Sequence, residues 1–235
     1  MWFFYDYYYI ALVLPMVILS LVAQWSVNST FEKYSKRTTV RGITGYDSAK
    51  MILDENGLSH IRIERVSGKL TDHYDPKAQV IRLSDAVYSS SSVAAVGVAA
   101  HEAGHAVQHA KGYIPIKIRS AIIPVTNIGS RLAIPLILIG LLFAGSGMEM
   151  LAYAGVALFS LTTVFQLVTL PVEFNASRRA ISAMKKSYRF DGNEITAAQK
   201  VLSAAAMTYV AALAVSVAQL LRLVLIVGGS RGRRN

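Results

Sequence analysis

Four long apolar runs constrain the fold of this chain more than any other feature. They cover residues 7–27, a stretch centred on 132–144, residues 148–170 and residues 204–227. About 20 apolar residues in a helix cross the ~30 Å hydrocarbon core of a bilayer. Only 16% of the residues are charged, whereas soluble domains carry about 25%. The sequence therefore predicts a mainly α integral membrane protein with about four transmembrane helices.

The polar region between the first two apolar runs predicts a small α+β module. Alternating apolar and polar residues indicate strands at 61–66 and 80–83. Gly57 closes a predicted helix at 48–56, and the serines at 89–92 together with Gly112 indicate a helix at 93–110. Residues 71–76, TDHYDP, have the composition of a turn. The predicted order is helix, strand, strand, helix.

These features divide the chain into five predicted segments. They are a transmembrane anchor (1–28), a cytoplasmic α+β module (29–119), a transmembrane helical hairpin (120–170), a cytoplasmic helical segment (171–203), and a last transmembrane helix with a basic tail (204–235). Pro171, at the end of the third apolar run, predicts a kink or a helix boundary.

The positive charges indicate which side of the membrane the polar segments occupy. The formal net charge is +10, and the basic residues flank apolar runs instead of alternating with aromatic residues. This favours the positive-inside bias of a multi-pass protein of the cell (plasma) membrane over nucleic-acid binding. Four spans then place the C-terminus outside, although the tail RGRRN carries three arginines. Four spans are still favoured, because the charges that follow the first span usually set the orientation.

One short stretch carries the chemistry of a metal site. Residues 101–105 read HEAGH inside the helix predicted at 93–110. Histidines four residues apart lie on one helix face, so His101 and His105 can bind the same Zn²⁺. Glu102 lies beside them and can act as a general base on water. Because the chain has no cysteine, the remaining ligands must be His, Asp or Glu.

The third ligand cannot be chosen from spacing alone. His109 lies about 12 Å along the helix axis from His101, too far for one ion. His60, His73 and the downstream carboxylates are open alternatives. Glu173 is the best of the carboxylates, because it follows an apolar run at the start of a helical segment. An acidic residue at such a position also suits the helix dipole without any metal.

Four stretches together resemble the YugP-type family of membrane neutral zinc metallopeptidases. They are TGYDSAKMIL (44–53), TDHYDPKAQVIRLS (71–84), HEAGHAVQHA (101–110) and PVEFNASRRA (171–180). The site layout is also similar to that of the membrane peptidase HtpX, a zincin in which a glutamate after a transmembrane helix is the third zinc ligand. The resemblance implies one zinc ion, His101, His105 and Glu173 as its ligands, and Glu102 as the base. Such a site is gluzincin-like (HExxH…E), and the HtpX likeness implies a role in protein quality control.

The chain departs from that family pattern at two positions near the predicted third ligand. Four residues after the ligand glutamate, the wider pattern has an aspartate that orients the first histidine, and this chain has Ser177. The family often has aspartate where this chain has Asn175. We therefore expect weaker support of the ligands here, or support from other residues.

The expected function is that of a zinc endopeptidase that cleaves membrane or unfolded proteins near the cytoplasmic membrane surface. The oxyanion donor is open between His73, Tyr74, His109 and Tyr188, and substrate is expected to pair with the strand at 80–83. The alternative is a non-catalytic membrane scaffold or adaptor braced by zinc. Arg131 and Arg222, near or within apolar runs, raise a weaker third possibility, a transport accessory protein. The oligomeric state does not follow from the sequence.

Overall fold

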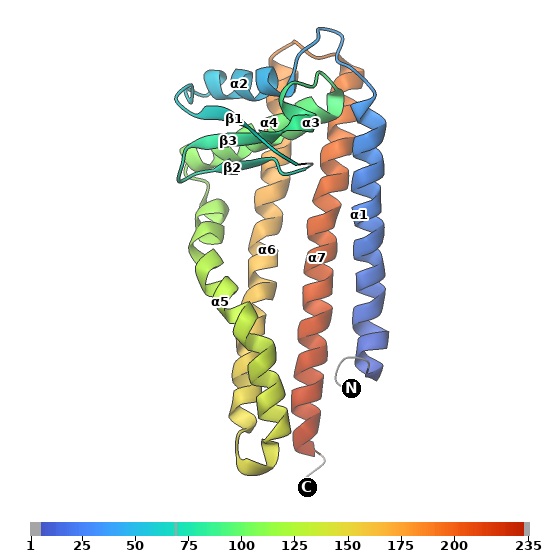
Figure 1. Ribbon diagram of the computed structural model, residues 1–235, viewed down its shortest axis with the longest axis vertical. Coiled ribbons are helices and arrows are strands. Elements are labelled where there is room, and N and C mark those ends of the chain that lie inside the picture. Colours follow the sequence, from blue (N-terminus) through green and yellow to red (C-terminus); the bar gives the residue numbers. More distant parts are fainter. Residues whose placement is uncertain (1–5, 69, 233–235) are drawn as a thin grey trace. The chain divides into compact units, whose positions relative to one another are not determined.

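The computed structural model describes residues 6–68 and 70–232, which form helices and one small sheet (Figure 1). The elements in chain order are η1 (Tyr9–Val13), α1 (Leu14–Ser35), α2 (Gly45–Glu55), β1 (Arg62–Val66), β2 (His73–Asp75), β3 (Val80–Ser84), α3 (Asp85–Tyr88), α4 (Val93–Ala110), α5 (Ile114–Leu142), η2 (Ala144–Ser146), α6 (Glu149–Lys186) and α7 (Gly192–Gly232).

The chain forms two compact units. The apolar unit comprises the described parts of Met1–Val22, Ile118–Leu170 and Tyr209–Asn235, and the sheet unit comprises Ala23–Lys117 and Pro171–Thr208. The boundaries between the units fall within α1, α5, α6 and α7. The five-segment division of the chain stays a prediction. The last three residues of its basic tail lie outside the described residues.

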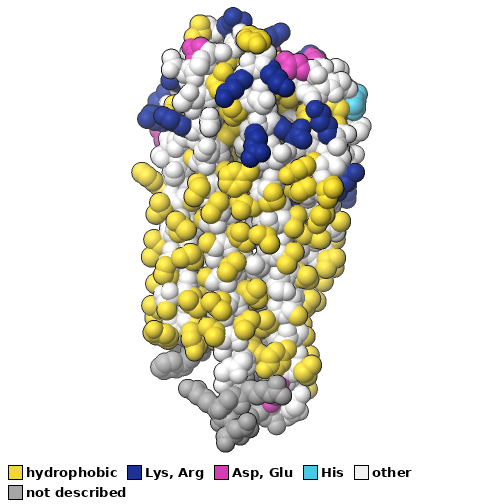
Figure 2. All heavy atoms as spheres, turned by 180° about the vertical axis from the view of Figure 1, so that it is seen from behind, with side chains coloured by type: hydrophobic (Ala, Val, Ile, Leu, Met, Phe, Trp, Pro, Cys, Tyr) yellow, Lys and Arg dark blue, Asp and Glu magenta, His cyan; other side chains and the backbone are white. Residues whose placement is uncertain are grey.

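Among the described residues, four helices are long and apolar enough to cross a membrane. They are Tyr9–Ser35, Ile114–Leu142, Glu149–Lys186 and Gly192–Gly229. Many large hydrophobic side chains of the apolar unit are exposed, for example Leu21, Leu142 and Met150. Figure 2 shows hydrophobic side chains covering the visible surface of these helices. Such a surface suits a lipid environment, so the prediction of a mainly α membrane protein with about four spans agrees with the structure.

A charged pair lies inside the apolar unit. Arg222 is 2% exposed, and it donates from Nη2 to Asp6 Oδ2 at 2.6 Å and from Nε to the same oxygen at 3.0 Å. Its guanidinium also lies 5.5 Å from the centre of the Tyr9 ring. The pair compensates the cost of burying the arginine and connects α7 to the N-terminal helix. The burial of Arg222 therefore has a structural explanation that requires no transport function.

The sheet of the second unit has three strands in the order β1-β3-β2. β1 pairs parallel with β3, and β2 pairs antiparallel with it. The prediction missed β2 and the short α3, because residues 71–76 have turn composition and three residues are too few to show strand periodicity. The prediction that substrate pairs with the strand at 80–83 was wrong, because both edges of β3 are already occupied.

The two principal helices of this unit begin and end at recognisable capping residues. α2 starts earlier than predicted, at Gly45, because Thr44 and Asp47 form a reciprocal capping box. α4 has the predicted bounds, since Ser92 Oγ accepts a hydrogen bond from the backbone of Ala95 and Gly112 has a left-handed φ of 64°. Both helix ends are thus fixed by local sequence.

Helix α4 lies in the core of the sheet unit. Its residues Val93, Ala99, Ala103 and Ala106 belong to one buried hydrophobic cluster. The same cluster contains residues of the other elements, Ile52, Ile81, Leu83, Ala180, Met184, Ala198 and Leu202. Small side chains on α4 let neighbouring helices approach closely.

Contrary to one expectation, Pro171 marks no helix boundary, because α6 continues through it to Lys186.

Candidate metal centre

The two histidines of HEAGH lie one turn apart on α4, as their spacing predicts. Their ring centres are 4.7 Å apart, and the ring planes cross at 86°. The side chain of His101 is 14% exposed and that of His105 is 11% exposed. α4 therefore presents two imidazoles side by side in a largely buried position.

Glu173 on α6 completes the cluster. Its neighbours Val172, Ala176 and Ala180 are fully buried, so this face of α6 packs into the protein core. The side chain of Glu173 is 2% exposed, and its Oε2 lies 3.2 Å from Nε2 of His101 and 3.5 Å from Nε2 of His105. One ligand atom from each of the three residues lies within 4.8 Å of the others. The sequence alone left Glu173 as one of several alternatives, and the structure places it at the histidines.

These distances fit a tetrahedral metal ion. Ligand bonds of ~2.0–2.1 Å at tetrahedral angles separate the ligand atoms by about 3.3–3.4 Å. The two nitrogen–oxygen distances of 3.2 and 3.5 Å bracket that value. The contacts are long for hydrogen bonds between a charged imidazole and a carboxylate, which are typically about 2.7–2.9 Å. Two imidazoles and a carboxylate are also the ligand set of many catalytic zinc sites.

The outer ring nitrogen of His105 is held by Gln108, a residue the sequence analysis did not single out. Gln108 is fully buried. Its Nε2 donates to the carbonyl oxygen of Val172 at 2.8 Å and to Oδ1 of Asn175 at 3.0 Å. Those bonds fix its Oε1 as the acceptor for Nδ1–H of His105, at 2.9 Å. The lone pair of His105 is thereby placed on Nε2, which faces Glu173.

The two departures from the family pattern have clear places in the structure. Oγ of Ser177 lies 3.1 Å from Nδ1 of His101, so a hydroxyl occupies the position of the expected aspartate. Oδ1 of Asn175 accepts from Gln108 and, at 2.8 Å, from Nε of Arg179. The groups that hold the two histidine rings in place are therefore neutral, and one of them, Gln108, lies on α4 itself.

The electrostatics of the cluster favour a positive charge at its centre. Burial lowers the pKa of His105, but hydrogen bonding to Glu173 and the negative charges of Glu102 and Glu173 outweigh it. The net pKa of His105 is raised above the ordinary 6.5. Two carboxylates beside one imidazole hold a proton in the absence of metal and would stabilise a divalent cation in its place.

Gly104 brings α4 and α6 close enough for the ligands to meet. A Cβ atom at this position would lie 2.7 Å from the carbonyl oxygen of Ala176, much closer than van der Waals contact. Ala176 is itself small and fully buried. The glycine of HEAGH is thus required by packing, because any side chain there would push α6, and Glu173 with it, away from the histidines.

Glu102 is buried beside the cluster but is not part of it. The residue is 8% exposed, and its carboxylate is not among the three groups that could share an ion. Its charge acts on His105. Within the described ranges 6–68 and 70–232 its side chain forms no hydrogen bond or ion pair, so its oxygens remain available to a water or a substrate.

The other residues considered from sequence lie away from the three ligand atoms. His109 is half-buried and its ring centre lies 5.6 Å from that of Tyr74, so these two pair with each other. His73 is exposed on β2, with Nδ1 2.8 Å from the carbonyl oxygen of Thr71. His60 and Tyr188 are exposed as well. Among the described residues, none of these five histidines and tyrosines joins the group of His101, His105 and Glu173.

Comparison with known proteins agrees with this geometry. A family model described as "Putative neutral zinc metallopeptidase" matches residues 9–228. The chain belongs to this family. It is also 48% identical over 218 residues, covering 93% of this chain and 96% of the relative, to the "Putative membrane protease YugP" of Bacillus subtilis (strain 168). No solved structure matches the chain.

Membership of the neutral zinc metallopeptidase family confirms the resemblance drawn from the sequence. The family match spans both the HEAGH helix and Glu173, so the three converging groups belong to the shared part of the chain.

Gln108 could have been recognised from sequence, because it is a polar residue three positions after His105 in a helix of small apolar residues. Its partners Val172 and Asn175 could not, since they lie 64 and 67 residues away.

Replacing Gln108 with Met is expected to weaken metal binding. The change keeps the side-chain volume but removes the acceptor for Nδ1–H of His105. Loss of such supporting bonds typically reduces metal affinity by about 10–100-fold. Zinc titration of the purified protein against a fluorescent chelator measures this. Gln108→Glu, which retains an acceptor oxygen, is expected to bind more tightly than Gln108→Met, and equal affinity of both variants with the parent would contradict the assigned role.

Metal affinity is expected to fall as pH is lowered towards and below the raised pKa of His105. The proton and the metal compete for Nε2, and the raised pKa means that the competition begins above pH 6.5. Metal binding in that range should therefore release a proton, which calorimetry in buffers of different ionisation enthalpy measures. Affinity that stays constant down through pH 6.5 would show that His105 does not bind the ion.

Proposed function

We propose that this chain is a membrane-embedded zinc-dependent endopeptidase that hydrolyses peptide bonds of membrane or unfolded proteins. The observation that carries the proposal is the convergence of Nε2 of His101, Nε2 of His105 and Oε2 of Glu173 at tetrahedral distances. The family match supports the reaction class. A glutamate beside the ligands, free of structural bonds, supplies the remaining group that hydrolysis needs.

The proposed cofactor is one zinc ion held by these three residues. Neutral imidazoles with one carboxylate suit zinc better than magnesium or calcium, which prefer oxygen ligands. Bound there, zinc would polarise the scissile carbonyl and lower the pKa of water. His101 and His105 hold their ring orientation through Ser177 and Gln108, so the ligands are positioned before substrate arrives.

Glu102 is the proposed general base. It takes a proton from the attacking water and transfers it to the leaving amine nitrogen as the peptide bond breaks. Its burial keeps bulk water away from the transferred proton. Glu102 follows His101 directly in sequence and lies on the same helix as both histidines. The helix therefore fixes its distance from the reacting atoms.

The substrate strand is assigned to the outer edge of β2 in place of β3. β2 pairs with β3 on one side only. Tyr74 of β2 packs against His109 of α4, which places this edge next to the helix of the site. An extended peptide that adds to this edge would run alongside α4 and bring a peptide bond towards the ligands.

The site is proposed to act at the cytoplasmic surface of the plasma membrane. Glu173 follows Leu170, the last residue of the third apolar run, by three positions. Basic residues on both flanks of the polar segments favour the cytoplasmic side. Substrates would then be membrane proteins cut near the bilayer or unfolded segments beside it.

Replacing Glu102 with Gln is expected to preserve bound zinc and abolish proteolysis. Loss of a general base typically lowers the rate by about 10²–10⁴-fold. Glu173→Ala is expected to lose most of the zinc, because two neutral imidazoles remain. Zinc content by elemental mass spectrometry and cleavage of an unfolded protein such as casein measure the two effects, with exposed Glu55→Gln as the matched control.

Full proteolysis by Glu102→Gln would reject the proposed mechanism. Zinc bound normally, together with no cleavage by the parent protein of any membrane or unfolded substrate tested, would favour the zinc-braced scaffold instead.

The orientation can be tested with single cysteines, because the natural chain has none. Lys77→Cys lies in the exposed turn before β3, and Ser146→Cys lies in the exposed link between α5 and α6. A membrane-impermeant maleimide added to intact cells is expected to label Ser146→Cys, and to label Lys77→Cys only after permeabilisation. The reverse pattern would place the site on the outside.

A further inference from the structure

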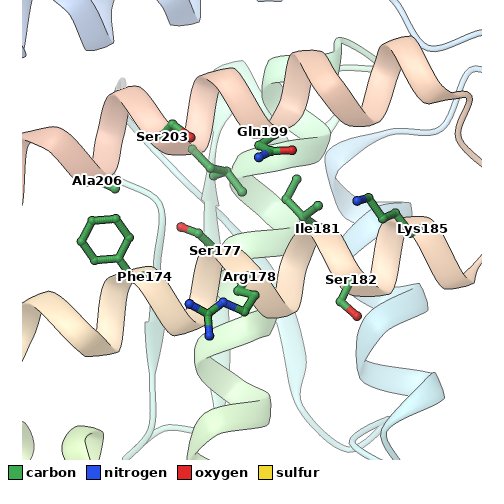
Figure 3. Close-up of a pocket in the computed structure, with 10 residues that line it drawn as sticks. Phe174, Ser177, Arg178, Ile181, Ser182, Lys185, Gln199, Ser203 and Ala206 are labelled. Carbon is green, nitrogen blue, oxygen red and sulfur yellow. The ribbon is translucent and has the colours of Figure 1, made fainter.

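A pocket of about 420 Å³ lies between α6 and α7 within the sheet unit (Figure 3). α6 contributes six of its lining residues and α7 contributes four. They are Phe174, Ser177, Arg178, Ile181, Ser182, Lys185, Gln199, Leu202, Ser203 and Ala206. Its volume is in the range of small-ligand sites. None of these residues is a proposed metal ligand, although Ser177 in the lining also contacts His101, so the pocket borders the metal centre without containing its ligands.

The charge of the pocket is entirely positive. Its ionisable lining residues are Arg178 and Lys185, and no Asp or Glu lines it. Both side chains are exposed, and neither forms a hydrogen bond or ion pair with any residue in the described part of the chain. Two cations without acidic partners are complementary to a phosphate group.

The two ends of the pocket differ in polarity, although apolar and polar residues alternate between them. On α6 the lining starts with Phe174 and ends with Lys185, and on α7 the apolar Ala206 follows the polar Gln199. Figure 3 shows Phe174 and Ala206 at one end, Lys185 at the other, and Arg178 between them. The apolar end is the one closest in sequence to the apolar runs that end at Leu170 and begin at 204.

We propose that this pocket binds an anionic phospholipid. The phosphate would lie against Arg178 and Lys185, and the start of an acyl chain would pass Phe174 and Ala206. Phe174 and Lys185 are eleven residues apart in sequence, about 16 Å along a helix, which is long enough for a head group and the first part of a chain. An acidic peptide would match the cations, but it would not match an apolar end beside membrane-crossing sequence.

The test measures lipid retention by the full-length protein. The protein is delipidated in detergent, incubated with vesicles of phosphatidylcholine and phosphatidylglycerol in equal parts, and analysed by native mass spectrometry. We expect preferential retention of phosphatidylglycerol. The double variant Arg178→Gln with Lys185→Gln is expected to weaken that retention by roughly tenfold to thirtyfold. Ser177 is left unchanged, because it contacts His101.

A charge-matched control separates the pocket from general surface charge. Arg189 and Lys200 are exposed and do not line the pocket, so Arg189→Gln with Lys200→Gln should retain the lipid like the parent. Ser203→Phe, which fills the pocket without changing charge, should lose it. Circular dichroism checks that each variant is folded.

Three results would overturn the proposal. The first is equal retention by the pocket variants and the control. The second is retention of phosphatidylcholine as strong as that of phosphatidylglycerol. The third is displacement of the lipid by soluble glycerol phosphate, or by an acidic peptide, at concentrations comparable to those of the lipid itself, because the acyl chain would then contribute nothing.

Discussion

The arrangement of the sheet unit depends on one buried carboxylate. Glu173 is 2% exposed, and burial of a carboxylate is unfavourable unless the charge is compensated. The compensation comes from two imidazole nitrogens of α4 at 3.2 and 3.5 Å. α4 and α6 must therefore pack at one separation and in one register. A shift of one residue along either helix would turn the carboxylate away from the histidines.

Small residues and one amide maintain that register. Gly104 permits close contact with Ala176, where an added Cβ atom would lie 2.7 Å from a carbonyl oxygen. Gln108 reaches from α4 to the backbone of Val172 and the side chain of Asn175, on either side of Glu173 in sequence. The same amide orients His105. One residue thus fixes the ligand ring and the helix that carries the third ligand.

The sequence allowed the local features of the site to be predicted. The bounds of α4 follow from Ser92, Gly112 and an apolar interior, and the pairing of His101 with His105 follows from helix periodicity. The contacts between distant segments did not follow. β2 is too short to show a pattern, and the central position of β3 depends on strand pairing across turns. Glu173 was the best of the carboxylates by its position after an apolar run, but only the resemblance made it the third ligand, because helix spacing gives no information about a partner more than sixty residues away.

The difference between a catalytic and a purely structural metal site rests on Glu102. A scaffold needs only groups that hold the ion or support its ligands, and Ser177, Gln108 and Asn175 already do the latter. Glu102 is not one of the three groups that could share an ion, and its side chain forms no hydrogen bond to a ligand in the described part of the chain. It is 8% exposed in a helix of small apolar residues, where a carboxylate that makes no bond lowers stability. Proteins retain such costly groups mainly where the chemistry uses them. The proposed role of Glu102 as proton acceptor in peptide hydrolysis gives this costly carboxylate a use.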